Sequence, residues 1–329
     1  MSSTLDLLPP IIQDDILKHT SIRDRVVLQR TGRDILNGKI FRYNSVSFNL
    51  HLNAAFWNVV TDAGEVTGVE YNRQDGGGHM VSKNKENFTV VPDVHFAEQA
   101  MIDFAALFTG RVSIVQDFVF STLSINNETR QQSWDHIFKW FPKNSSLKVK
   151  NLYFVHGFHP QAMELIGAFD DNSLQRLSFD FPGSEAGSVA FQQRSDFPVM
   201  DTMIQYPHWT KAKIFTMHIN SFCELPISQF WHFDVCEIGL RDLSYSDAHD
   251  LMEKYLACPN FQSCRIRFPN NSNAIETISN GFMNDYGSVN LAFSMEEGDD
   301  VYISVSPQTI SEGPYHDIRV FVFRRCKKV

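Results

Sequence analysis

Cysteine and histidine side chains are the most chemically versatile groups in this sequence, which has five cysteines and twelve histidines in 329 residues. Cys258 and Cys264 are separated by five residues, whereas paired zinc-binding cysteines usually lie about two to four residues apart. The sequence has no Gly-x-Ser-x-Gly elbow, no phosphate-binding loop and no His-x-Glu motif. We therefore expect no catalytic residue, no metal site and no cofactor, and we predict that the protein is not an enzyme.

Aromatic residues are unusually dense between residues 209 and 233. Tryptophan and tyrosine dominate the binding energy of many protein interfaces, but aromatic residues also fill hydrophobic cores. The sequence leaves both interpretations open. The candidate contacts with a protein target are Trp209, Phe222 and Trp231.

The charge balance disfavours nucleic acid as the main ligand, because 29 Lys and Arg residues face 38 Asp and Glu residues. The basic stretch 324–328 leaves a minor RNA-binding role open. No apolar run approaches the roughly 18 residues that a membrane span needs. Because the first twelve residues also lack the basic and apolar parts of a signal peptide, we expect a cytoplasmic or nuclear protein with reduced cysteines.

Hydrophobic spacing divides the chain into four parts. Residues 1–40 show the spacing of three short helices, and residues 41–95 alternate as in a β-rich connecting segment. Residues 96–285 alternate helical and strand-like patterns, and residues 286–329 contain strand-like runs separated only by turns. This pattern predicts an α/β protein: a small three-helix N-terminal part, an irregular leucine-rich-repeat-like β/α arc and a C-terminal antiparallel β cap.

The first forty residues resemble an F-box. The resemblance begins with Leu8-Pro9 and an Ile/Leu-rich first helix, continues with Asp24-Arg25 and Leu28, and ends near Arg33. It implies that this segment docks on the Skp adaptor of a cullin-RING ubiquitin ligase. The residues that the resemblance assigns to this contact are Leu8, Pro9, Ile12, Ile16, Leu17, Asp24, Val27 and Leu28.

A second resemblance covers roughly residues 130–285 and is to the FTH domain, which accompanies F-boxes in nematode proteins. The matching segments occur in the family's order and include Lys148-Val149-Lys150, Ser173-Leu174-Gln175, His208-Trp209-Thr210-Lys211-Ala212-Lys213, Leu225-Pro226-Ile227, His232-Phe233, Leu243-Ser244-x-x-Asp247 and Cys258-Pro259-x-Phe261. No segment is diagnostic alone, but their order and combination are specific.

Together the two resemblances imply a substrate-recognition adaptor of a Skp-cullin-F-box ubiquitin ligase, in which the FTH domain binds a protein target. The alternative is a binding protein without ligase function that sequesters a regulatory partner, such as an RNA-binding protein. The sequence identifies neither the target nor the surface that binds it.

Overall fold

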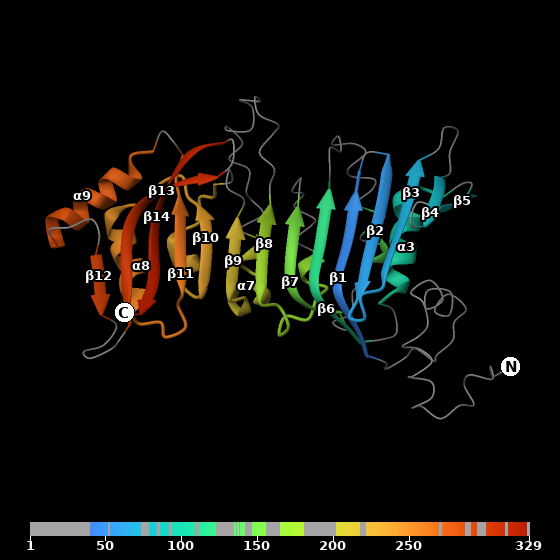
Figure 1. Cartoon of the computed structure of the whole chain (residues 1–329), viewed down its shortest axis with the longest axis horizontal. Helices are drawn as coiled ribbons and strands as arrows, with labels where there is room; N and C mark the ends of the chain where they lie inside the picture. Colours follow the sequence, from blue (N-terminus) through green and yellow to red (C-terminus); the bar gives the residue numbers. More distant parts are fainter. Residues whose placement is uncertain are drawn as a thin grey trace. The chain divides into compact units, whose positions relative to one another are not determined.

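The computed structural model describes residues 40–51, 53–73, 79–83, 86–91, 94–108, 112–122, 135, 137, 139–141, 147–155, 165–180, 202–217, 222–269, 272–286, 291–294, 301–312 and 315–327. The chain forms two compact units, Met1–Leu174 and Gln175–Val329. Both are built on mixed sheets, whose strands and helices are labelled in Figure 1.

The first unit has strands in the order β7-β6-β1-β2-β3-β4-β5. β7, β6 and β1 are parallel neighbours, whereas β1 to β5 pair antiparallel in chain order. The elements are β1 (Ile40–Leu50), β2 (Ala54–Thr61), β3 (Val66–Arg73), β4 (His79–Lys83), β5 (Glu86–Val91), α3 (Phe96–Ala106), β6 (Val112–Thr122) and β7 (Leu147–Val155).

A tight connection explains why β2 and β3 are antiparallel. Gly64 has φ of 82° and donates its N–H to the Thr61 carbonyl at 3.0 Å. This left-handed conformation suits glycine, which has no Cβ to clash with the backbone. The backbone N–H of Glu65 donates to Thr61 Oγ1, also at 3.0 Å. The chain therefore reverses within a few residues, which forces the next strand to run antiparallel.

The core of the first unit lies between the sheet and α3. Phe104 on α3 packs edge-on against Phe48 of β1 and Phe118 of β6, with ring centroids 5.2 and 6.0 Å apart. The Tyr71 hydroxyl of β3 donates to Asp103 Oδ2 at 2.6 Å, so a polar contact also fixes the helix on the sheet. The helical spacing of residues 101–108 predicts this helix, and the structure confirms it.

The second unit has strands in the order β12-β13-β14-β11-β10-β9-β8. β8 to β11 are parallel, whereas β14 pairs antiparallel with β11 and β13, and β13 pairs antiparallel with β12. The elements are β8 (Arg176–Asp180), α7 (Pro207–Lys211), β9 (Ile214–Met217), the 3-10 helix η4 (Ile227–Phe230), β10 (Val235–Gly239), α8 (Tyr245–Leu256), β11 (Ser263–Arg267), α9 (Ala274–Tyr286), β12 (Leu291–Ser294), β13 (Val301–Glu312) and β14 (Tyr315–Lys327).

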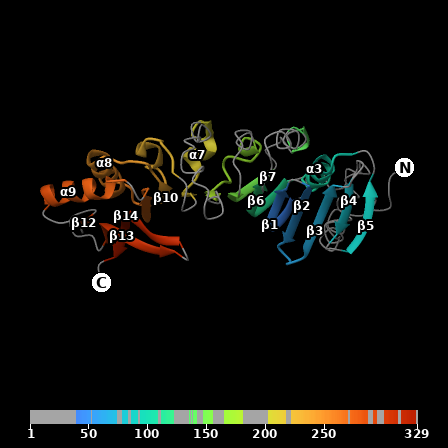
Figure 2. The same ribbon diagram turned by 90° about the horizontal axis from the view of Figure 1, so that it is seen from above.

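The helices of the second unit lie on one face of its sheet (Figure 2). Phe215 of β9 packs against Trp209 of α7, and Phe321 of β14 stacks on Phe282 of α9. Alternate residues of β8 to β11 are fully buried on this side, and their neighbours on the opposite face are half-buried. Burial alternates from one residue to the next because successive side chains of a strand point to opposite faces of the sheet, and helices cover only one of these faces.

Helix α8 forms where the sequence predicts it. The Ser244 side chain accepts a hydrogen bond from the Asp247 backbone N–H at 3.1 Å, as a helix N-cap should. The buried face consists of Ala248, Leu251, Met252 and Tyr255, spaced three or four residues apart. Because capping and spacing are local properties, the sequence alone identifies this helix.

The chain is α/β overall, but the predicted leucine-rich-repeat-like β/α arc is wrong. Mixed sheets dominate, and the segment that was predicted only to connect the two parts belongs to the sheet of the first unit, because β1 pairs in parallel with β6. The connections between parallel strands also differ: α7 has 5 residues, η4 has 4 and α8 has 12. The units between the parallel strands therefore lack the regular strand and helix lengths of a repeat. The three short helices predicted for residues 1–40 lie almost wholly outside the described residues, which begin with strand residue Ile40.

Candidate partner-binding surfaces

The predicted Skp-binding residues lie outside the part of the chain that the structure describes. They are Leu8, Pro9, Ile12, Ile16, Leu17, Asp24, Val27 and Leu28. Their role in binding therefore stays a prediction from sequence. The three predicted target contacts are all described and lie in the second unit.

Trp209 is a core residue, with only 1% of its surface exposed. Its ring lies edge-on to Phe215, Phe230 and Phe233, with centroid distances of 5.0 to 5.6 Å. The indole Nε1 donates to the Gln229 carbonyl at 3.1 Å. Trp209 therefore joins α7 to the η4 region and, with its surface buried, does not offer a contact to a partner.

His232 strengthens the same junction. Its Nε2 lies 2.8 Å from the Trp209 carbonyl oxygen, and because a carbonyl only accepts, Nε2 carries the proton. Burial, the largest influence, lowers the pKa of His232 below its ordinary value, so the imidazole is neutral at pH 7. We name the group Trp209, Phe215, Phe230, His232 and Phe233 the Trp209 cluster. The cluster packs α7 against the η4 region and therefore has a structural role.

The other two predicted contacts keep part of their surface exposed. Phe222 and Trp231 are half-buried. The Lys254 ammonium lies 5.2 Å from the centre of the Trp231 ring, within the range of a cation–π contact. Both residues remain candidates for a partner interface, whereas Trp209 acts through the core.

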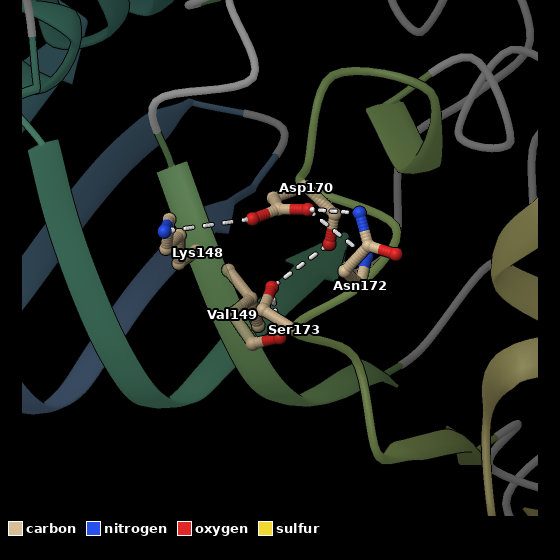
Figure 3. A network of polar contacts seen from close by, with 5 residues as sticks. All are labelled: Lys148, Val149, Asp170, Asn172 and Ser173. Atoms are coloured by element: carbon tan, nitrogen blue, oxygen red, sulfur yellow. Dashed lines mark hydrogen bonds and ion pairs between the residues drawn. The ribbon is translucent and has the colours of Figure 1, made fainter.

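A polar network joins two segments that carry the FTH resemblance (Figure 3). Asp170 Oδ1 accepts from the backbone N–H of Asn172 at 2.9 Å, and its other oxygen lies 3.9 Å from Lys148 Nζ. Ser173 Oγ lies 3.1 Å from the Val149 carbonyl oxygen and 2.8 Å from that of Asp170. This network holds the loop that contains Asp170 and Ser173 against β7. The FTH-like residues Lys148 and Ser173 therefore have a structural role here.

The five cysteines all lie among the described residues, and three of them are buried. Cys236 and Cys264 are buried register partners on β10 and β11, and all five cysteines are free thiols. Burial, the largest influence, raises the pKa of Cys236, and it raises the pKa of Cys223 to about 11. A buried, protonated thiol is a poor nucleophile and a poor metal ligand.

One group of potential metal ligands occurs among the described residues. The ligand atoms of His249, Asp250 and Glu253 lie within 4.8 Å of one another on α8. The two carboxylates are exposed, and the His249 Nε2 is already 2.7 Å from the Tyr286 hydroxyl. The group is better described as part of a polar surface between α8 and α9.

The sheet face opposite the helices of the second unit carries a row of polar residues in register across four strands. Thr216 donates to Ser178 at 2.8 Å, and Arg265 donates to Glu237 at 2.8 Å. These groups satisfy one another within the row. Part of the hydrogen-bonding capacity of this polar row is therefore already used by contacts within the row.

A second polar surface lies where α8 and α9 meet (Figure 1), and unlike the row on the sheet it includes exposed aromatic and apolar side chains. The Tyr245 hydroxyl donates to Asp285, and the His249 ring stacks on Tyr286 with centroids 6.1 Å apart. We name Tyr245, His249, Glu253, Met283, Asp285 and Tyr286 the α8–α9 surface. Met283 and Tyr286 are 46% and 41% exposed, high values for such large apolar or aromatic residues.

The close approach of the two helices depends on Gly281. An added Cβ at this position would overlap the Tyr245 ring and lie closer to it than side chains tolerate. The Tyr245 ring is also held by Phe282, edge-on at 5.1 Å. Glycine therefore lets the Tyr245 ring lie against the backbone of α9, which places its hydroxyl beside Asp285.

The electrostatic environment of the α8–α9 surface is negative. The pKa of Tyr245 is raised, first by burial and then by its hydrogen bond to Asp285. The pKa of Tyr286 is raised by burial and then by the charges of Asp285 and Glu253. This site is not evident from the sequence alone, because its residues come from segments of α8 and α9 that lie about forty positions apart. The local signal is the pair Tyr245 and His249, one helical turn apart.

No helix among the described residues is long and apolar enough to cross a membrane.

Comparison with known families identifies an FTH domain at residues 131–280, slightly less than half of the chain. This confirms the FTH part of the resemblance and points to a role in protein interaction. The matched range includes the Trp209 cluster, the network of Figure 3, α8 and part of α9. Neither the curated proteins nor the solved structures contain a match.

Proposed function

We propose that the protein is a substrate-recognition adaptor of a Skp-cullin-F-box ubiquitin ligase. The FTH match supports a protein-interaction role for residues 131–280, and this observation carries the proposal. The F-box-like sequence of residues 1–40 supplies the ligase connection. In this division of labour other subunits transfer ubiquitin, and this chain supplies proximity and orientation.

The positions of the FTH motif residues favour a separation between scaffold and specificity. Trp209, His232 and Ser173 hold turns and helices in place through hydrogen bonds to the backbone. Such residues preserve the shape of the domain without selecting a target. The choice of target then depends on exposed side chains outside these motifs.

The ligase connection is tested by changing Ile16 to Asp in the full chain. The substitution places a charge where the F-box resemblance predicts contact with an apolar groove, so co-purification with a Skp homologue should fall by about a hundredfold or more. Gln13→Asp, in the same segment but outside the predicted contact set, is the matched control and should bind normally. Unchanged binding of Ile16→Asp would contradict the F-box assignment.

A reconstituted ubiquitin-transfer reaction separates this function from sequestration. An adaptor needs residues 1–40 for ubiquitin transfer to a bound partner, whereas a sequestering protein holds the partner equally well without them. Partner binding that persists without any transfer by the full chain would favour sequestration of a regulator, such as an RNA-binding protein.

A further inference from the structure

We propose that the α8–α9 surface binds a basic segment of the target protein, in which arginine or lysine side chains contact tyrosine rings and carboxylates. This inference rests on the proposed function, since it assigns the surface through which the FTH-containing part captures its target. A protein segment fits better than a small ligand because the exposed residues spread over two helices.

The first support is the exposure of apolar and aromatic groups close together. Of the described residues, large hydrophobic side chains are exposed at only a few positions, and Met283 and Tyr286 are two of them, one turn apart on α9. The Tyr286 ring is also positioned by His249, whose Nε2 lies 2.7 Å from its hydroxyl. Aromatic rings held in place in this way bind a partner with little loss of conformational entropy.

The second support is uncompensated negative charge. Asp250, Glu253 and Asp285 form no ion pair with a Lys or Arg among the residues that the structure describes. The partner of Asp285 is the Tyr245 hydroxyl, and that of Glu253 is His249 at 3.9 Å. The neighbouring cation Lys254 lies over the Trp231 ring instead. A basic partner would supply the missing positive charges.

The combination of rings and carboxylates selects for cations. An arginine side chain stacks on an aromatic face and also forms paired hydrogen bonds with a carboxylate, so both groups of this surface can engage it at once. The polar row on the open sheet face differs, since Arg265 there already pairs with Glu237. The α8–α9 surface therefore has more unused binding capacity for a charged partner.

A direct test uses the purified full chain and a short fluorescein-labelled peptide in which arginines alternate with leucine and serine. Fluorescence anisotropy should show binding that weakens by about tenfold in the double variant Glu253→Gln/Asp285→Asn, which corresponds to about 1.4 kcal/mol. Tyr286→Ala should weaken binding by about fivefold, whereas Tyr286→Phe should stay within about twofold because it keeps the ring.

The matched control removes the same charge elsewhere. Asp62 and Glu65 are exposed acids of the first unit, and Asp62→Asn/Glu65→Gln should change peptide binding by less than about twofold. Equal weakening by both double variants would show nonspecific attraction to an acidic protein and would overturn the proposal. Equally tight binding of a peptide with glutamate in place of arginine, or no binding of the arginine peptide, would also overturn it.

This test is independent of the ligase connection. The Ile16→Asp variant should bind the peptide normally even if it no longer binds the Skp homologue. Ile16 belongs to the F-box-like segment, whereas the peptide is expected to bind the α8–α9 surface. Loss of the F-box function alone would leave the peptide result intact. Failure of the peptide result alone would leave the adaptor role standing and move the target contact to another surface, such as that of Phe222 and Trp231.

Discussion

The Trp209 cluster and the α8–α9 surface use similar residues for different purposes. Both combine aromatic rings with a histidine and hydrogen bonds. Trp209 is 1% exposed and its Nε1 and carbonyl groups are both bonded, whereas Tyr286 is 41% exposed beside carboxylates that pair with no Lys or Arg of the described residues. Burial and charge compensation, rather than residue type, therefore separate a structural contact from a recognition surface.

The largest effect should follow from removing the centre of the buried cluster. Trp209→Ala leaves a cavity between Phe215, Phe230 and Phe233 and should lower the free energy of unfolding by about 3–5 kcal/mol. Denaturant titration of the full chain measures this loss. Tyr286→Ala is the counterpart on the exposed surface and should cost less than about 1 kcal/mol. Similar losses for both variants would remove the distinction between the two regions.

A smaller effect is expected from Gly281→Ala at the contact of α8 and α9. The new Cβ would clash with the Tyr245 ring, and we expect a net loss of about 1–3 kcal/mol, although alanine is intrinsically favoured in helices. Asn280→Ala, at the exposed neighbouring position, serves as the control. In a double-mutant cycle, Gly281→Ala should no longer lower the free energy of unfolding when Tyr245 is also changed to Ala, because the clashing ring is then absent. A stabilised Gly281→Ala single variant would contradict the close approach.

The N-terminus of α8 offers a more modest change. Ser244→Ala removes the side chain that caps the helix and should reduce the free energy of unfolding by about 1 kcal/mol. Ser246→Ala changes an exposed serine two positions later and should be nearly neutral. If the two variants were equally stable by thermal unfolding, the cap would not hold α8 in place.

The smallest effect is a dependence of stability on alkaline pH. The pKa of Tyr245 is raised from 10.0, first by burial and then by Asp285, so the folded protein holds this proton more tightly than the unfolded chain. The contribution is fully present below pH 10.0 and is lost as pH rises through the folded pKa. The pKa values of Tyr255 and Tyr286 are raised as well, so phenolate absorbance should show late ionisation whose amplitude falls by one tyrosine in Tyr245→Phe. Ordinary titration of every tyrosine would refute the assigned environment.

Local patterns predicted some elements well. The cap at Ser244 and the apolar spacing from Ala248 to Tyr255 identify α8, because both involve residues within a few positions of one another. The apolar residues of 235–240 and 263–268 recur with the spacing typical of strands, and these segments are likewise found as β10 and β11. These features depend on short-range geometry, which a single sequence records directly.

Long-range features were not predictable in the same way. The spacing of apolar residues does not say which distant strands pair, so the parallel pairing of β1 with β6 was not predicted. Nor does it show that Trp209 is buried, since core and interface tryptophans look alike in sequence. The contact between Tyr245 and Asp285 joins residues 40 positions apart, and only the packing of α8 against α9 brings them together.

The most direct test of the account is quantitative affinity purification of the full chain, Ile16→Asp and Glu253→Gln/Asp285→Asn from native cells. We expect Ile16→Asp to lose the Skp homologue while retaining its other partners. The double variant should keep the Skp homologue and lose a partner that carries an exposed basic segment. If both variants retain every partner, or if each loses the same set, then separate ligase and target contacts are contradicted.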